Sequence, residues 1–221
     1  MESTTSSFLD DTVNPAVRGF LHFPENPNGD ALILTHGAGT DCAAPLLVAL
    51  SESFAGHGYA VLRCDLPYRQ ERPTGPPPPG SAERDRAGLG NAVAALRRMV
   101  AGRIFLGGHS YGGRQATLLC ADEPDLVSGL LLLSYPLHPP RKPDQLRIQH
   151  LPNLRTPSLF VHGTRDPFGS VDEMTKALRL IPARTELMKV EGAGHELGFK
   201  GKTRALELPA SVLVRFEEMF R

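Results

Sequence analysis

The sequence has no excess of either charge and few cysteines. Lys plus Arg and Asp plus Glu both number 24 in 221 residues, so the formal net charge is zero. Because this balance attracts no polyanion over long range, it argues against binding to nucleic acid or to anionic lipid. The three cysteines, Cys42, Cys64 and Cys120, fit neither a disulfide framework nor a paired Cys-x-x-Cys zinc site, which indicates a reducing compartment.

Long apolar runs are also missing. No stretch approaches the roughly 20 apolar residues that a membrane span needs. The first fourteen residues are polar and acidic, without the basic start and apolar run of a signal peptide. We therefore expect a cytoplasmic protein with no membrane partner, and a chain of this length fits one domain, 1–221.

What the sequence does contain is an alternation of two kinds of segment. Short apolar runs rich in branched residues predict strands at 17–23, 31–35, 60–64, 103–107, 129–134, 158–162 and 185–190. Apolar residues spaced three and four apart predict helices at 45–55, 83–100, 113–120, 171–180 and 208–220. This order predicts an α/β fold with a mostly parallel central sheet and helices on both faces.

The segment 67–81 breaks the alternation, because it contains Arg69, Arg72 and four consecutive prolines at 76–79. Proline lacks a backbone donor and resists both helix and sheet, so this segment is predicted to be an exposed loop. It acts either as a stiff connector or as a rim over a site, since it follows the carboxyl end of a strand.

The strongest chemical signal is Gly-His-Ser-Tyr-Gly at 108–112. The bare pattern is common, but here it lies directly between a predicted strand and a predicted helix, as a nucleophile elbow requires. Gly108, Gly112 and Gly113 would relieve the crowding of such a sharp turn. Ser110 is therefore the candidate nucleophile, and the Tyr111 N–H at the start of the helix is a candidate oxyanion donor.

A serine hydroxyl needs a base and an acid that orients the base, in the chain order serine, acid, histidine. Asp166 and His195 each follow a predicted strand, at the sheet edge where Ser110 is expected. We predict that His195 takes the Ser110 proton and that Asp166 fixes the tautomer of His195. Three other acidic residues remain alternatives for this last role: Asp144, Asp172 and Glu191.

The second half of an oxyanion hole should come from the loop after an early strand. His-Gly-Ala-Gly-Thr at 36–40 follows the strand predicted at 31–35. Ala38 and Gly39 are the candidate donors, although the sequence does not separate their N–H groups from that of Thr40.

Three motifs together carry a family resemblance: His-Gly-Ala-Gly at 36–39, Gly-Gly-His-Ser-Tyr-Gly-Gly-Arg at 107–114 and Gly-Ala-Gly-His at 192–195. On these the chain resembles the α/β-hydrolase superfamily, within it the cap-less intracellular group related to dienelactone hydrolases and to the hydrolase-like domain of a chromatin-complex subunit. Dienelactone hydrolases proper carry a cysteine nucleophile, so Ser110 argues against transferring their substrate.

Many members of this superfamily insert a lid of several helices after the elbow helix, but here only residues 135–157 separate the two strands concerned. That length leaves no room for a full cap. Tyr135 and His138 are candidate substrate-binding residues in this segment, or else they belong to a loop without specific contacts.

The remaining polar residues of the motifs are expected to be structural. His36 and His109 should make local hydrogen bonds, His162 should serve structure more than catalysis, and Arg114 should pair on the helix surface. No His, Cys or carboxylate set has metal-ligand spacing, so no metal and no cofactor is expected.

The leading hypothesis is hydrolysis of a small-molecule ester, or of a similar activated acyl group, through an acyl-enzyme on Ser110. One alternative is an idle hydrolase-fold scaffold that acts in a protein complex. Another is a hydrolase of C–C or peptide bonds on the same residues. The oligomeric state and the identity of the substrate do not follow from the sequence.

Overall fold

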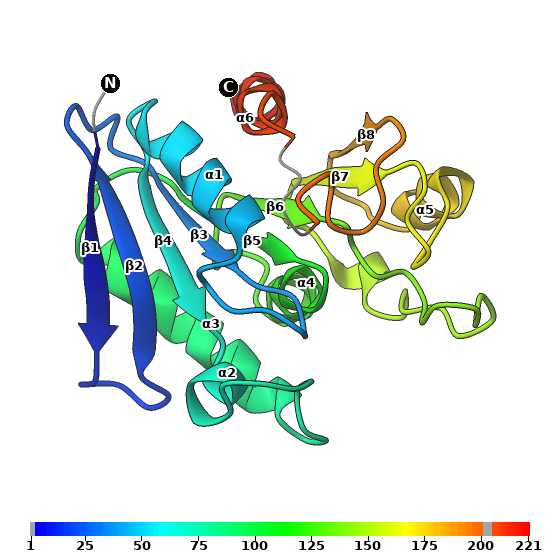
Figure 1. Cartoon of the computed structure of the whole chain (residues 1–221), viewed down its shortest axis with the longest axis horizontal. Helices are drawn as coiled ribbons and strands as arrows, with labels where there is room; N and C mark the ends of the chain where they lie inside the picture. The colour runs from blue at the N-terminus through cyan, green and yellow to red at the C-terminus, as the bar shows by residue number, and fades with distance from the viewer. Residues whose placement is uncertain (1–2, 201–204) are drawn as a thin grey trace.

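An eight-stranded sheet runs through the part of the protein that the computed structural model describes, residues 3–200 and 205–221 (Figure 1). Its order is β1-β2-β4-β3-β5-β6-β7-β8. Only the pairs β1–β2 and β2–β4 are antiparallel, so the predicted mostly parallel sheet is confirmed. Residues 1–2 and 201–204, which the single-domain prediction includes, lie outside the described residues. The strands are β1 Ser3–Asp10, β2 Val17–Pro24, β3 Ala31–Thr35, β4 Ala60–Asp65, β5 Ile104–His109, β6 Gly129–Leu133, β7 Ser158–Gly163 and β8 Thr185–Val190.

Helices cover both faces of the sheet, as predicted (Figure 1). Helices α1 (Pro45–Ala55) and α6 (Leu208–Phe220) share one apolar core with one face, whereas α3 (Ala82–Arg97), α4 (Tyr111–Asp122) and α5 (Val171–Leu178) share a second core with the other. Phe216 of α6 packs edge-on against Phe54 and Phe105, with ring centroids 5.1 and 4.8 Å apart. Strand β3 is buried along its whole length between these layers, which explains its continuous apolar run.

Strand β1 was not predicted. Its sequence, Ser-Thr-Thr-Ser-Ser-Phe-Leu-Asp, has no alternation of apolar and polar residues, because it lies at the edge of the sheet and most of its side chains are exposed. It pairs with β2 along all eight of its residues. Backbone pairing rather than side-chain burial therefore holds it.

The prediction of an exposed loop over 67–81 was wrong for its first residues. They form a short helix, α2 (Pro67–Glu71), in which Pro67, Tyr68 and Arg69 are buried. Proline at the first helical position costs no hydrogen bond, since the N–H there has no partner inside the helix. The rest of the segment, up to α3, contains no regular element apart from turns.

The connection between β6 and β7 begins with buried residues at 135–138 and continues with an exposed stretch at 140–146. Its only helix among the described residues is one 3-10 turn, η1 (Leu151–Asn153), so the expected absence of a cap agrees with the structure. Of the helices within 3–200 and 205–221, none has the length and apolar content that a membrane crossing requires.

Candidate active site

Ser110 lies at the tight turn between β5 and α4. Its φ is 51°, in the left-handed region that residues other than glycine rarely adopt. The Ser110 N–H donates to the Leu133 carbonyl at 2.8 Å, which ties the turn to the neighbouring strand β6. The strained conformation holds the hydroxyl above the carboxyl end of the sheet, and Ser110 is only 9% exposed.

The glycines around Ser110 are required by close contacts. A Cβ on Gly108 would lie 2.9 Å from the Gly113 nitrogen, and one on Gly113 would lie 2.7 Å from the Gly108 carbonyl oxygen. A Cβ on Gly112 would instead meet the end of β3, 2.6 Å from the His36 carbonyl oxygen. The elbow is therefore crowded as the sequence predicts, although Gly112 faces a neighbouring strand and not Gly108.

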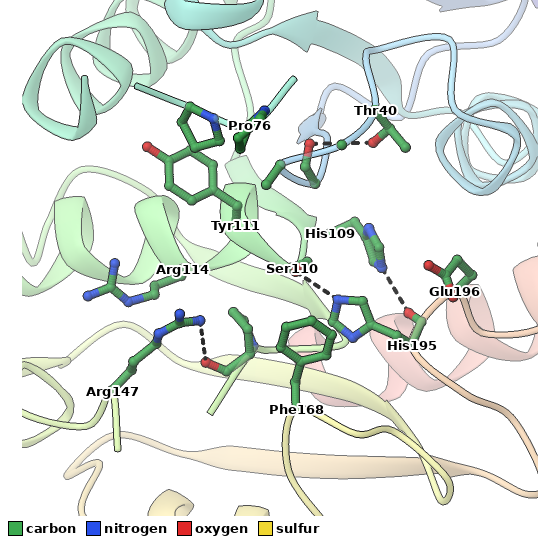
Figure 2. Close-up of a pocket in the computed structure, with 15 residues that line it drawn as sticks. Thr40, Pro76, His109, Ser110, Tyr111, Arg114, Arg147, Phe168, His195 and Glu196 are labelled. Atoms are coloured by element: carbon green, nitrogen blue, oxygen red, sulfur yellow. Dashed lines mark hydrogen bonds between the residues drawn. The ribbon is translucent and has the colours of Figure 1, made fainter. Parts of the chain in front are cut away.

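The three residues predicted to act together are in contact, and Figure 2 shows the bond between Ser110 and His195. The Ser110 hydroxyl lies 2.8 Å from His195 Nε2, and His195 Nδ1 lies 2.8 Å from the Asp166 carboxylate. Since a carboxylate only accepts, Nδ1 carries the proton and Nε2 is free to accept from the serine. None of the alternatives Asp144, Asp172 and Glu191 bonds to His195.

Asp166 is placed so that it stays ionised. Burial alone would raise the pKa of its carboxyl, but the hydrogen bond and charge of His195 hold the pKa below its usual range. The Phe168 N–H also donates to the carboxylate, at 2.8 Å. A fixed negative charge at this position stabilises a protonated His195.

Two neighbours of His195 were not predicted to contact it. The ring of Phe168 stacks on the imidazole at 4.1 Å between centroids, from the loop just after Asp166. His109 Nε2 donates to the His195 carbonyl at 2.9 Å, and burial, followed by the charge of His195, lowers the pKa of His109 to about 4. His109 is therefore neutral near pH 7 and fixes the backbone of the His195 loop, in agreement with the local bonding expected for it.

The candidate oxyanion donors line the same cavity as Ser110 and come from two elements, the start of α4 and the loop after β3. Within the described part of the chain the N–H groups of Tyr111, Ala38 and Gly39 make no hydrogen bond, whereas the Thr40 N–H donates to the Gly37 carbonyl at 3.3 Å. This difference separates Ala38 and Gly39 from Thr40, which the sequence alone does not do. Free N–H groups beside a nucleophile can bind a developing negative charge.

Helix α2 fixes the loop that carries two of these donors. Arg69 donates from Nε to the Thr40 carbonyl at 2.8 Å and from Nη2 to the Ala38 carbonyl at 3.0 Å. The Tyr68 hydroxyl also bonds to the Ala38 carbonyl, at 3.0 Å. A carbonyl and the N–H of the next residue belong to one planar peptide unit. The bonds from α2 to the Ala38 carbonyl therefore also fix the direction of the Gly39 N–H. The sequence signal was Tyr-Arg directly after a helix-starting proline, which the proline-rich context obscured.

A cavity of about 660 Å³ opens in front of Ser110 (Figure 2). Tyr135 and His138, predicted as substrate-binding residues, are not on its wall. Both are buried, with the Tyr135 hydroxyl donating to the Arg147 carbonyl at 2.7 Å and His138 Nδ1 to the Pro139 carbonyl at 2.8 Å. The residues that line the cavity are Gly37, Ala38, Gly39, Thr40, Pro76, Pro77, His109, Ser110, Tyr111, Arg114, Pro136, Arg147, Phe168, His195 and Glu196.

The cavity wall corrects one expectation and decides another. Arg114 was expected to pair on the helix surface, but it lines the cavity, because it follows Ser110 by one helical turn and shares its face. Its Nε is buried without a hydrogen-bond partner. Pro76 and Pro77 show that the proline-rich segment forms part of the rim, as one of its two interpretations proposed.

The other histidines near the site make structural bonds. His36 Nδ1 donates to the Gly37 carbonyl at 2.8 Å and His36 Nε2 accepts from the Leu66 N–H at 3.1 Å. His162 Nε2 donates to the Gly169 carbonyl at 2.7 Å, which holds the loop after Asp166. Among the residues that the structure describes, no group of three or more His, Cys, Asp or Glu side chains is placed to hold a metal ion.

Comparison with known proteins shows the family of the chain. A family model described as an alpha/beta hydrolase domain matches residues 28–209. A cutinase, est2, of Thermobifida alba is 26% identical over 183 residues, which are 80% of this chain and 56% of that protein. The chain thus spans little more than half the length of that relative.

Solved structures show the same fold over nearly all of the chain. A dienelactone hydrolase from Anabaena variabilis has a TM-score of 0.75 at 19% identity and covers 100% of this chain and 98% of its own. XC6422 from Xanthomonas campestris, described as a serine hydrolase without a lid, has a TM-score of 0.72 at 13% identity, with coverage of 100% and 96%. At these identities the likeness establishes the fold of the chain.

Proposed function

The chain belongs to the alpha/beta hydrolase family, and from this premise we propose that it is a serine hydrolase that cleaves esters or similarly activated acyl groups. One observation carries the proposal: a continuous pair of 2.8 Å hydrogen bonds runs from the Ser110 hydroxyl through His195 to Asp166, at the mouth of a cavity. The substrate is a small molecule, and the reaction needs no cofactor.

The first half of the reaction acylates Ser110. As the Ser110 oxygen bonds to the acyl carbon, its proton passes to His195 Nε2, and the carbonyl oxygen becomes an oxyanion. The N–H groups of Tyr111, Ala38 and Gly39 receive that charge. When the intermediate collapses, the bond to the leaving alcohol breaks and His195 returns the proton to the alcohol oxygen.

The second half releases the acid. Water donates a proton to His195 Nε2 while its oxygen bonds to the acyl carbon, and the bond to the Ser110 oxygen then breaks. The proton returns from His195 to Ser110, so the enzyme is regenerated and one water is consumed for each ester. Asp166 stays ionised throughout, in keeping with the lowered pKa of its carboxyl.

The test is hydrolysis of 4-nitrophenyl acetate, butyrate and octanoate by the wild type and by Ser110→Ala. We expect turnover by the wild type, a loss of several orders of magnitude in the variant, and a preference among chain lengths that reports the cavity. Ser128→Ala, which lies on the loop before β6 and away from the cavity, serves as the matched control. Equal activity of Ser110→Ala and the wild type would contradict the proposal.

A further inference from the structure

Two arginines face the cavity without a counter-ion. Arg114 comes from the first turn of α4 and Arg147 from the connection between β6 and β7, and both line the cavity in front of Ser110. Figure 2 shows them on the same side of Ser110, with Glu196 on the opposite side. No ion pair within the described residues includes either arginine.

The arginines are also short of other partners. Arg114 Nε is buried and makes no hydrogen bond, and the side-chain partner of Arg114 is the neutral Tyr135 hydroxyl. Arg147 Nη1 makes only a long contact of 3.4 Å with the Pro136 carbonyl. Burial, and then the charge of Arg114, lowers the pKa of the Arg147 guanidinium, so the two side chains repel each other. Guanidinium groups in protein interiors normally pair with carboxylates or phosphates, which makes this an incomplete arrangement.

Both arginines are held in place by the fold. The Arg114 N–H donates to the Ser110 carbonyl at 3.0 Å in the first helical turn, which fixes the side chain one turn from the nucleophile. The Arg147 carbonyl accepts from the buried Tyr135 hydroxyl at 2.7 Å, and the Arg147 N–H donates to the Leu137 carbonyl at 2.8 Å. The backbone positions of both arginines in the cavity wall are therefore fixed, and both side chains are partly buried.

We infer that Arg114 and Arg147 form a subsite for a carboxylate carried by the substrate, and that the preferred substrates are monoesters of dicarboxylic acids. This inference rests on the proposed ester hydrolysis. Two guanidinium forks suit the two oxygens of a carboxylate. The apolar wall of Pro76, Pro77 and Pro136 suits the hydrocarbon chain between the carboxylate and the ester.

The position of the subsite assigns the carboxylate to the acyl part. His195 must protonate the leaving alcohol, so that alcohol lies beside His195, on the side where Glu196 also lines the cavity. A negative charge there would be repelled by Glu196. On the other side of Ser110, the same charge would meet Arg114 and Arg147.

The experiment compares 4-nitrophenyl hydrogen adipate with its methyl ester, which differs only in the masked carboxylate. For the wild type we expect kcat/KM for the acid to exceed that for the methyl ester by about 10- to 100-fold, the range of one charge-assisted hydrogen bond. Arg114→Gln and Arg147→Gln should each lower this ratio by about 10-fold, and Arg114→Lys should restore part of it. Arg179→Gln, an exposed arginine at the end of α5, should leave the ratio unchanged.

Binding to Ser110→Ala, measured by calorimetry with the same two esters, tests the subsite without catalysis. If the protein binds the acid selectively and Arg114→Gln abolishes this selectivity, the subsite is supported. Absence of turnover in the same protein would count against the proposed function alone. Turnover without preference for the acid, or a preference that survives both glutamine variants, would overturn the subsite. Competition by glutarate and by inorganic phosphate separates the anions, and stronger Arg114-dependent inhibition by phosphate would overturn the carboxylate assignment.

Discussion

Replacing Arg69 with Gln should disable the oxyanion loop while leaving substrate binding nearly intact. Arg69 is 5% exposed, and its guanidinium donates to four carbonyl oxygens, those of Thr40, Ala38, Arg72 and Gly75, at 2.8 to 3.0 Å. Glutamine is shorter and uncharged, so it cannot reach both sides of this network. The Ala38 and Thr40 carbonyls would then turn toward other donors, and the N–H groups beside them would move with the peptide planes.

The loss of these contacts should affect both kcat and stability. An oxyanion donor that no longer points at the oxyanion lowers kcat by about 10²-fold, which corresponds to roughly 2.7 kcal/mol of transition-state stabilisation. Because the lost hydrogen bonds come from a buried charge, the free energy of unfolding should also fall by about 3 kcal/mol. KM for a neutral ester should change little, since Arg69 itself does not line the cavity.

The assay is steady-state hydrolysis of a 4-nitrophenyl ester, together with urea denaturation. Leu50→Ala, a buried residue of α1 remote from the cavity, is the matched control, because it should destabilise by a similar 2 to 5 kcal/mol through a cavity in the core. Arg69→Lys should recover part of kcat. A folded Arg69→Gln protein with wild-type kcat, or an equal loss of kcat in Leu50→Ala, would refute the reasoning.

Three further predictions concern separate parts of the protein. Asp166→Asn should lower kcat by about 10⁴ with little change in stability, since the amide favours the wrong tautomer of its histidine partner; activity within tenfold of the wild type would contradict this. Gly108→Ala should lower the free energy of unfolding by about 1 to 3 kcal/mol, because the new Cβ would lie 2.8 Å from a carbonyl oxygen of β3. In the control Gly90→Ala the new Cβ meets nothing within 4 Å, so this variant should not be destabilised. Equal urea midpoints of the two variants would argue against the crowding at Gly108. The buried His22 accepts a hydrogen bond from Arg63, and burial lowers the pKa of His22 from 6.5 to about 4. The unfolded chain therefore takes up the proton first, and the free energy of unfolding should fall by about 3 kcal/mol as the pH drops from 6.5 to 4. His22→Gln should reduce this fall, and parallel pH profiles of the two proteins in urea titrations would speak against it.

The elbow and its partners were predictable because their signals are local in the sequence. Ser110 is flanked by glycines and lies between a branched apolar run and a helical pattern. The strand before the turn and the helix after it are therefore both evident in the sequence. Asp166 and His195 follow strands that end at the same edge of a parallel sheet, so their meeting follows from topology. The structure adds the distances and the tautomer.

The residues that the sequence did not reveal depend on contacts between distant segments. Arg69 acts on carbonyls about thirty positions earlier in the chain, and backbone acceptors have no residue signature. The residues next to Arg114 in the sequence are typical of a surface arginine. Arg147 comes near it only through the path of the β6–β7 connection. Strand β1 carries no apolar alternation, because pairing with β2 holds it at an exposed edge.

The most direct test of the account is intact-mass measurement after treatment of the folded protein with a fluorophosphonate, which reacts only with an activated serine. We predict one adduct per chain, located at Ser110 by peptide mapping, and no adduct in Ser110→Ala or after prior unfolding. Asp166→Asn and Arg69→Gln should label more slowly than the wild type. A folded wild-type protein that takes up no adduct, or takes it up at another serine, would contradict the central claim that His195 and Asp166 activate Ser110.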